Sequence, residues 1–200
     1  PFLEVTLQDM VTFEMRKSPM NQALSTKIGV LTVSDRAFRG VYEDRGGPEV
    51  RNWLTPRIPN CPPFEMRIVS DDRSLIAAAI EEMAAECCLI ITTGGTGFGP
   101  RDITPEATAD ACEVLIPGFG EKMRAKTWDQ VPTAILSRAT AGRRGTCLVI
   151  NLPGNPKAIS ECLDVIWTAI PHAIETAGGP DLEAEDAAPA PHDPPEKSPS

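Results

Sequence analysis

The chain has 200 residues, 42% of them hydrophobic and 24% charged, which suffices for one globular domain with a closed core but not for two. Its formal net charge of −9 repels polyanions at long range, so nucleic acid is excluded as an expected partner. No apolar run approaches the roughly 18 residues that cross a bilayer, and no signal-peptide pattern opens the chain, so we expect a cytoplasmic protein without a membrane partner.

The chain divides into three parts by composition. Residues 1–25 lack a sustained hydrophobic period and are interpreted as an N-terminal extension outside the fold. Residues 26–179 alternate apolar runs with amphipathic segments and form the predicted domain. Residues 180–200 are rich in proline, alanine and acids, a composition typical of a disordered tail.

Four short apolar runs predict β-strands, at residues 27–33, 64–69, 89–92 and 146–150. Two of them are apolar enough to be buried on both faces, which favours a parallel sheet. Helices are expected between the strands, so the element order is βαβαβα.

Three helices carry boundary signals. The first has Asp72 as its predicted N-cap and an apolar face at residues 75, 76, 79, 80, 83 and 84. The second starts at Thr104 as a cap, followed by a proline. The third spans about 156–177, with a kink expected at Pro171 and a glycine cap at residues 178–179.

Polar or glycine-rich residues follow each predicted strand, at 34–36, 70–72, 93–97 and 151–156. In an open parallel sheet, ligands bind beyond the carboxyl ends of the strands. We therefore expect these four loops to line one cleft.

The third loop contains Gly-Gly-Thr-Gly at residues 94–97, with Gly99 close behind. Backbone N–H groups that no Cβ obstructs are suited to phosphate oxygens. The segment is not a P-loop, because Pro100 and Arg101 stand where that motif has Lys and Ser or Thr. A tight turn between strand and helix is the alternative interpretation.

Two aspartates, Asp71 and Asp102, each follow a predicted strand and its loop. Carboxylates that reach one cleft from different loops suit Mg²⁺ bound to the phosphates of a nucleotide. Solvated loop acids are the alternative, and helix capping is favoured for Asp72. Nearby cations that can meet phosphate charge are Arg101, Arg138 and Lys157.

Five motifs together resemble, in order, those of the MogA/MoaB-type molybdopterin-binding domain, which includes the gephyrin G domain. They are Ser-Asp-Arg at 34–36, TTGGTGFGPRDITPEAT at 92–108, PGFG at 117–120, AILSR at 134–138 and NLPGNP at 151–156. The resemblance runs from about Ile28 to Ala177, and it is specific because the long glycine motif is rare outside the family.

The resemblance implies a three-layer α/β/α fold with a mostly parallel central sheet, assembled as a homotrimer. It implies a nucleotidyltransferase that transfers AMP from Mg-ATP to the terminal phosphate of molybdopterin and releases pyrophosphate. No domain of the molybdate-inserting type follows, so hand-over to another protein is expected.

By the resemblance, Asp71 and Asp102 are the catalytic acids and the Mg²⁺ ligands. The implied nucleotide- and molybdopterin-binding residues are Ser34, Asp35, Thr93, Gly94, Gly95, Thr96, Gly97, Ser137, Arg138, Pro153, Gly154, Asn155 and Lys157. Proline usually precedes the first acid in the family, whereas Ser70 precedes Asp71 here and Asp72 follows it, which leaves the registration open by one residue.

Two alternatives remain at this point. One is a family member that binds molybdopterin or a nucleotide without turnover, or that acts as a scaffold. The other is a nucleotide-hydrolysing relative of the CinA type, against which the run Pro100-Arg101-Asp102 argues.

Overall fold

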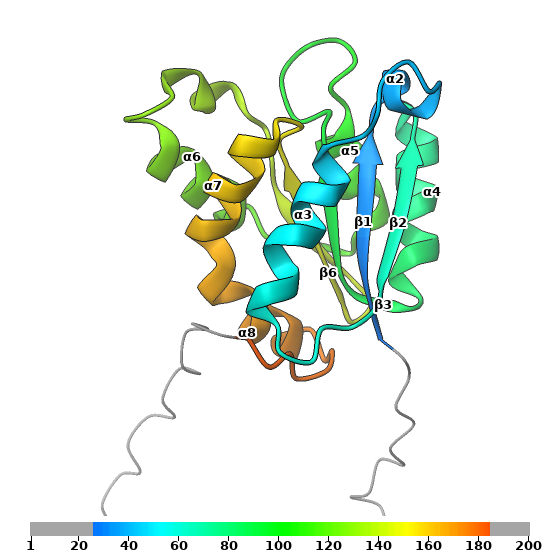
Figure 1. The fold of residues 1–200 in the computed structure, drawn as a ribbon, viewed down its shortest axis with the longest axis vertical. Helices are drawn as coiled ribbons and strands as arrows, with labels where there is room; N and C mark the ends of the chain where they lie inside the picture. The colour runs from blue at the N-terminus through cyan, green and yellow to red at the C-terminus, as the bar shows by residue number, and fades with distance from the viewer. Residues whose placement is uncertain (1–25, 185–200) are drawn as a thin grey trace, which may run out of the picture.

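The computed structural model describes residues 26–184, so the expectations for residues 1–25 and 185–200 lie outside the described residues (Figure 1). The strands are β1 (Lys27–Val33), β2 (Phe64–Val69), β3 (Cys87–Thr93), β4 (Val114–Leu115), β5 (Ala141–Arg144) and β6 (Cys147–Leu152). The α-helices are α2 (Asp35–Phe38), α3 (Gly46–Leu54), α4 (Arg73–Ala84), α5 (Thr104–Ala111), α6 (Gly118–Thr127), α7 (Pro156–Ile166) and α8 (Ile170–Thr176). Three 3₁₀ turns are η1 (Thr55–Arg57), η2 (Pro132–Leu136) and η3 (Trp167–Ala169).

The strands form one sheet in the order β2-β1-β3-β6-β5-β4. The first four are parallel, which confirms the predicted parallel sheet. β5 and β4 continue the sheet in antiparallel pairs. Neither of these two strands is predicted from the sequence, because β4 has two residues and β5 reads Ala-Gly-Arg-Arg.

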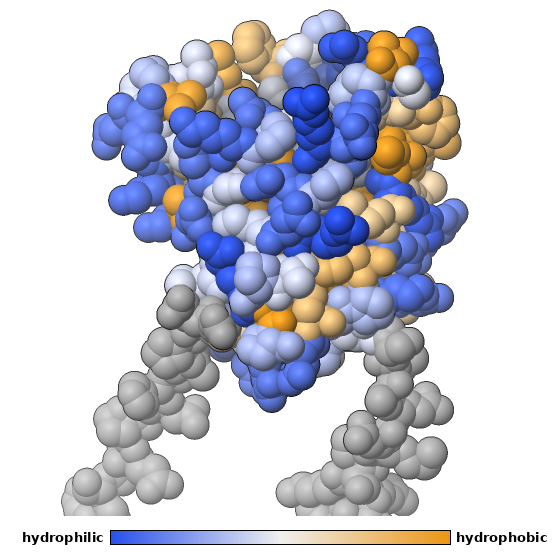
Figure 2. All heavy atoms as spheres, viewed as in Figure 1, coloured by the Kyte–Doolittle hydropathy of each residue, from blue (hydrophilic) through white to orange (hydrophobic). Residues whose placement is uncertain are grey.

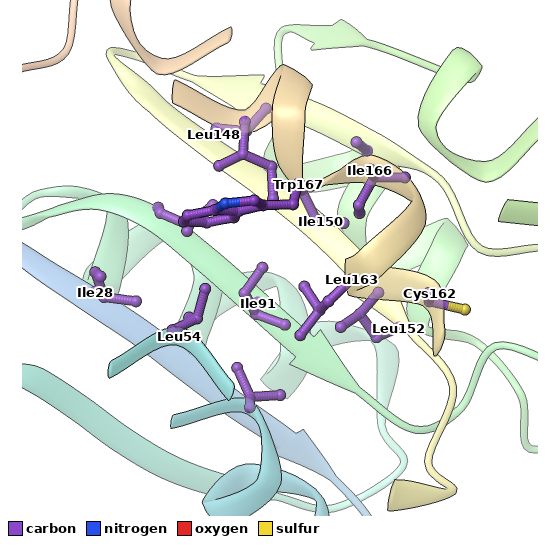
Figure 3. Close-up of a cluster of buried hydrophobic side chains, with 14 of the residues drawn as sticks. Ile28, Leu54, Ile91, Leu148, Ile150, Leu152, Cys162, Leu163, Ile166 and Trp167 are labelled. Carbon is purple, nitrogen blue, oxygen red and sulfur yellow. The ribbon is translucent and has the colours of Figure 1, made fainter. Parts of the chain in front are cut away.

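Helices cover both faces of the sheet, which confirms the three-layer α/β/α architecture (Figure 1). One face packs against α3, α6, α7 and α8 in a core that includes Leu54, Ile91, Leu163 and Trp167 (Figure 3). The other face packs against α4 and α5 in a smaller core. Because β1, β3 and β6 bury apolar side chains on both faces, the parallel strands are fixed in the middle of the domain.

The start of α4 confirms one capping prediction and corrects its apolar face. The Asp72 carboxylate accepts hydrogen bonds from the N–H groups of Ser74 and Leu75, both at 3.0 Å. Leu75, however, is 50% exposed, and the buried positions are 76, 79, 80 and 83. Leu75 lies about 100° around the helix from Ile76, which turns it away from the sheet.

Two other helix boundaries differ from the predicted ones. Thr104 is the first residue of α5 and not its N-cap, since its hydroxyl donates to Gly94 O at 2.9 Å. The predicted helix 156–177 is interrupted by η3, just before Pro171. α8 ends at Thr176, and Gly178 follows two residues later with a φ of 82°. The break near Pro171 and the glycine cap are therefore confirmed.

Packing continues past the predicted end of the domain at residue 179. Leu182 is only 5% exposed and belongs to the larger core, and Glu183 accepts a hydrogen bond from Asn60 at 3.0 Å. Residues 180–184 are therefore docked on the domain, in contrast to the expected start of a disordered tail at Pro180.

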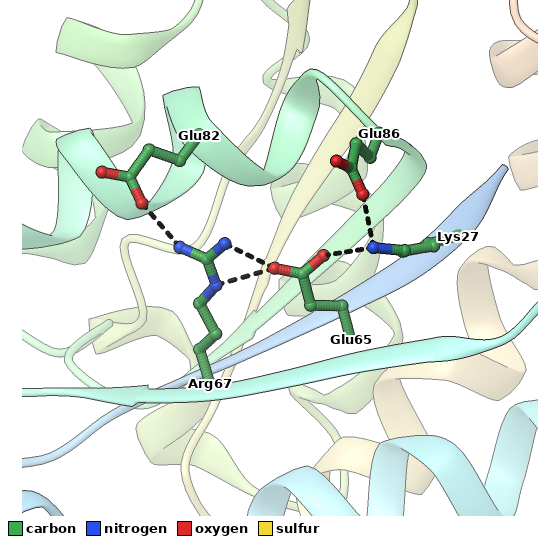
Figure 4. A network of polar contacts seen from close by, with 5 residues as sticks. All are labelled: Lys27, Glu65, Arg67, Glu82 and Glu86. Atoms are coloured by element: carbon green, nitrogen blue, oxygen red, sulfur yellow. Dashed lines mark hydrogen bonds and ion pairs between the residues drawn. The ribbon is translucent and has the colours of Figure 1, made fainter. Parts of the chain in front are cut away.

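A network of five charged residues ties the edge strand β2 to β1 and α4 (Figure 4). Glu65 accepts from Arg67 Nε at 2.7 Å and pairs with Lys27 at 3.5 Å. Arg67 also pairs with Glu82 at 2.7 Å, and Lys27 with Glu86. Exposed ion pairs each contribute about 0–1 kcal/mol, so this network adds little to the free energy of unfolding.

The face of the domain that Figure 2 shows is mainly polar, and apolar residues gather on its right, over α2 and β2. The exposed apolar side chains there are Phe38 (57%), Met66 (40%) and Ile68 (40%). No helix between residues 26 and 184 has the length and apolarity to span a membrane.

The six cysteines are free thiols. Four of them are buried and the other two, Cys61 and Cys112, are partly buried. Burial raises the pKa of the Cys87 thiol to about 12, which makes it unreactive near neutral pH.

Candidate active site

The glycine loop, residues 94–99, leaves the carboxyl end of β3 in a conformation that requires glycine. Gly94 has a φ of +101°, and a Cβ on it would lie 2.4 Å from Val33 O. Its N–H donates to Leu152 O at 3.1 Å, and its carbonyl accepts from the Thr104 hydroxyl. The loop is therefore pinned between β1, β6 and the start of α5.

Buried polar side chains support the glycine loop from below. The amide of Asn151 is fully buried and donates to the hydroxyls of Thr92 at 3.0 Å and Thr108 at 2.8 Å. The hydroxyl of Thr93 donates to Pro153 O at 2.9 Å. These bonds fasten the loop after β6 to the loop after β3, as expected for segments that share one rim of the sheet.

The Asp102 carboxylate rests against the glycine loop. Its Oδ2 accepts from the Gly99 N–H at 2.9 Å, and a Cβ on Gly97 would lie 2.7 Å from the same oxygen. Glycine at position 97 is therefore what admits the carboxylate. Oδ1 has no hydrogen-bond partner among the described residues, so it is open to a ligand.

Asp71 and Asp35 hold each other at the ends of β2 and β1. The N–H of Asp35 donates to Asp71 Oδ2 at 2.8 Å, and the N–H of Asp71 donates to Asp35 Oδ1 at 3.2 Å. Arg101 pairs with the Asp35 carboxylate and donates to Asp71 O at 3.2 Å. Arg101, which directly precedes Asp102, thus contacts both members of this pair. No direct contact joins Asp71 and Asp102.

A pocket of about 540 Å³ opens beside the glycine loop. Its walls come from α6, η2 and α7, and they are mostly apolar, with Met123, Leu136 and Ala158 among them. Gly97, Asp102 and Ser137 supply polar groups at its lining. A largely apolar hollow with a few convergent polar groups is typical of a small-molecule site.

Comparison with known proteins gives the family. Residues 29–172 match the family described as "Probable molybdopterin binding domain". The chain belongs to this family. The match covers the sheet, the glycine loop and the pocket described above.

Several relatives of this chain bear the name "Molybdopterin adenylyltransferase". A "Molybdopterin adenylyltransferase" of Helicobacter pylori is 50% identical over 150 residues, which are 74% of this chain and 85% of that protein. The protein of the same name from Escherichia coli K12 is 39% identical, over 78% of this chain and 88% of its own length. The crystal structure of the molybdopterin biosynthesis enzyme MoaB from Thermus thermophilus superposes with a TM-score of 0.69 at 38% identity, over 78% of this chain and 99% of that one.

The structure brings some of the predicted binding residues to the pocket. Thr96, Gly97, Ser137 and Pro153 line the pocket. Ser34 is the N-cap of α2, where its hydroxyl accepts from Ala37 N at 3.3 Å.

Two other predicted binding residues are engaged at the start of α7. Asn155 caps this helix and accepts from the Lys157 N–H at 3.1 Å. The Lys157 side chain is 84% exposed and pairs with Glu161 at 3.7 Å. Glu161 lines the pocket, which places the ammonium group of Lys157 near its mouth.

Two residues at the site were not predicted from the sequence. Arg124 lines the pocket and donates to Ser137 O at 3.1 Å and Ala139 O at 2.9 Å. Asp44 accepts from the hydroxyl of Thr32 at 2.8 Å and from Gly46 N at 2.9 Å, which anchors the start of α3 at the rim. Neither residue directly follows a predicted strand, so the expectation that ligands bind beyond the carboxyl ends of the strands did not identify them.

The acids at the rim suit a magnesium ion that a nucleotide helps to bind. Between residues 26 and 184, no group of three or more His, Cys, Asp and Glu side chains can hold a metal alone. Mg²⁺ is commonly held by one or two carboxylates together with substrate phosphates and water. Asp71 and Asp102, hard oxygen donors at one rim, fit that pattern.

Proposed function

We propose that this chain is a molybdopterin adenylyltransferase that transfers AMP from ATP to the terminal phosphate of molybdopterin and releases pyrophosphate. The observation that carries the proposal is the Asp102 carboxylate, which rests on the glycine loop at the lining of a 540 Å³ pocket. Relatives at 39% and 50% identity that bear this enzyme's name support it.

The pocket and the loop divide the task of binding. The apolar wall that contains Met123 and Leu136 suits a flat ring system, and Ser137 offers a hydroxyl beside it. The glycine loop offers unobstructed N–H groups to phosphates. Its segment from Gly94 to Gly97 and the turn at Pro153–Asn155 are proposed contacts for nucleotide or pterin, with Ser34, Asp35 and Lys157 at the periphery.

In the proposed reaction, a terminal phosphate oxygen of molybdopterin forms a bond to the α-phosphorus of ATP. The bond from that phosphorus to the bridging oxygen breaks, and pyrophosphate leaves with the electron pair. The nucleophile is already ionised near neutral pH, so the protein needs to position the reactants and to stabilise charge. Asp71 and Asp102 would hold Mg²⁺, which neutralises phosphate charge when it is bound.

Positioning follows from how each acid is held. Asp102 keeps one oxygen on the Gly99 N–H, so the direction of its carboxylate is set before substrate binds. Asp71 is oriented by the N–H of Asp35. Both carboxylates are thereby preorganised at the rim where the phosphates would lie.

The test is an assay of the purified chain with ATP, Mg²⁺ and molybdopterin. Pyrophosphate release that depends on molybdopterin supports adenylyl transfer. AMP release without molybdopterin would indicate a hydrolase, and binding of molybdopterin without either product would indicate a binding or scaffold protein. Asp102→Asn should abolish turnover and retain molybdopterin binding. Asp110→Asn is the matched control, since Asp110 is an exposed acid of α5 paired with Arg73.

We also propose that the chain forms a homotrimer and passes its product to a molybdate-inserting protein. The exposed apolar side chains over α2 and β2 (Phe38, Met66 and Ile68) supply a surface that assembly could cover. Light scattering of the purified chain measures the oligomer directly, and a monomeric mass would refute the trimer. The cytoplasmic location stays a prediction from the sequence.

A further inference from the structure

Arg138 lies between η2 and β5, and its guanidinium contacts both the glycine loop and α5. Nε donates to Gly97 O at 2.6 Å, Nη2 donates to Asp102 O, and Nη1 pairs with the carboxylate of Glu106 on α5. Each of the three nitrogens therefore has a partner on the glycine loop or just after it. A guanidinium fork can satisfy three acceptors in different directions, which an ammonium group cannot do in the same geometry.

The backbone around Arg138 is fixed as well. The Arg138 N–H donates to Thr96 O at 2.8 Å, and Arg124 donates to the carbonyls on either side, Ser137 O and Ala139 O. The side chain thus projects from an anchored segment. Because its segment is anchored, the Arg138 guanidinium can restrict the movement of the glycine loop that it contacts.

The Glu106 carboxylate depends on Arg138 for its ion pair. Its Oε2 is buried and has no hydrogen-bond partner among the described residues, so Arg138 is the cation that compensates the carboxylate. Burial raises the pKa of Glu106, but the hydrogen bond from Arg138, the Glu106 backbone N–H and the charges of Arg138 and Arg73 together outweigh it, and the pKa is lowered. Glu106 is therefore ionised at neutral pH and holds the guanidinium in place.

We propose that Arg138 is a positioning residue, which clasps the glycine loop to the pocket wall and thereby sets the Asp102 carboxylate for adenylyl transfer. The sequence predicts Arg138 as a ligand of a substrate phosphate, whereas in the structure all three guanidinium nitrogens contact acceptors of the protein. The inference rests on the proposed role of Asp102. It adds Glu106 as the counter-ion that orients the clasp.

The test compares Arg138→Lys with wild type in the pyrophosphate-release assay. Lysine keeps the charge and loses the fork, so we expect kcat to fall on the order of 10²-fold, the scale of a displacement of about 1 Å at a reacting group. The KM values for ATP and molybdopterin should change only a few-fold. Hydrogen exchange of the peptide that contains residues 93–102 should be faster than in wild type, with no substrate present.

A phosphate-binding Arg138 predicts the opposite pattern. Lysine also binds phosphate as a point charge, so kcat would be retained and one substrate's KM would rise. That result, or wild-type exchange in residues 93–102, would overturn the proposal. An inactive wild-type chain would instead refute the proposed function, while the exchange measurement would still report on the clasp.

Two further variants keep the test decisive. Arg73→Ala removes an exposed arginine of α4 whose ion pair is with Asp110 of α5 and not with the glycine loop, so its kcat and loop exchange should equal those of wild type. Glu106→Gln keeps an acceptor for Arg138 and loses the charge, so kcat should fall in the same direction but less. If Arg138→Lys fails to fold, unchanged kcat and loop exchange in Glu106→Gln refute the clasp.

Discussion

Asp71 and Asp72 are adjacent carboxylates whose replacement should have opposite consequences. Asp72→Ala leaves the N–H groups of Ser74 and Leu75 without the side-chain oxygen that accepts them at 3.0 Å. Loss of an N-cap costs about 0.5–2 kcal/mol of stability. At about 2–4 °C per kcal/mol for a domain of this size, Tm should fall by roughly 1–8 °C, with turnover unchanged.

Asp71→Asn should do the reverse. The amide oxygen can still accept from the Asp35 N–H, now bonded at 2.8 Å, so Tm should stay close to that of wild type. The variant loses the negative charge at the rim. Turnover should fall by roughly 10²–10³-fold, the scale for removal of one electrostatic contact to a transition state.

Thermal unfolding by circular dichroism and initial rates of pyrophosphate release measure the two effects on the same preparations. Each variant serves as the control for the other, because the residues are neighbours and the substitutions both remove one charge. An active Asp71→Asn protein with a lowered Tm, beside an inactive Asp72→Ala protein of unchanged Tm, would show that the catalytic acid is Asp72.

The remaining predictions concern the core, the thiols and the clasp. Leu182→Ala should lower the free energy of unfolding by about 2 kcal/mol, the lower end for a buried leucine, and chemical denaturation checks this; no change would mean that residue 182 is not docked. In native protein at pH 8, a thiol reagent should label the partly buried Cys61 before the four buried cysteines, and early labelling of Cys87 would contradict its raised pKa of about 12. Glu106→Gln should be less stable than wild type at pH 7, and the difference should disappear as the pH falls below about 4.5, because a lowered folded pKa contributes stability only above that range; a constant difference would contradict the ion pair.

Residues that follow strands were predictable, because the parallel sheet brings its carboxyl ends to one rim. Asp71, Asp102 and the glycine loop were all identified in this way, and the cap at Asp72 followed from local side-chain geometry. These signals are local in sequence and need only the strand assignment.

Contacts between distant segments were not predictable. Arg138 lies 36 residues from Asp102 along the chain, and nothing beside it in the sequence shows that its guanidinium meets Asp102 O and Gly97 O. Leu182 stands in a segment whose composition is typical of disorder, yet its side chain is buried in the larger core. Such contacts depend on the assembled fold, which composition and periodicity do not encode residue by residue.

The reversed direction of β5 has a consequence for how this site can diversify. Because β5 runs antiparallel to β6, its first residue, Ala141, lies opposite Ile150 near the rim, so the segment 128–140 enters the site from a strand's beginning. Insertions or deletions between α6 and β5 would reshape the pocket wall without disturbing the parallel strands that precede Asp71 and Asp102. Under the proposed function, the segment that selects the substrate could therefore change separately from the acids that act on phosphate, provided that Arg138 keeps its contacts with the glycine loop.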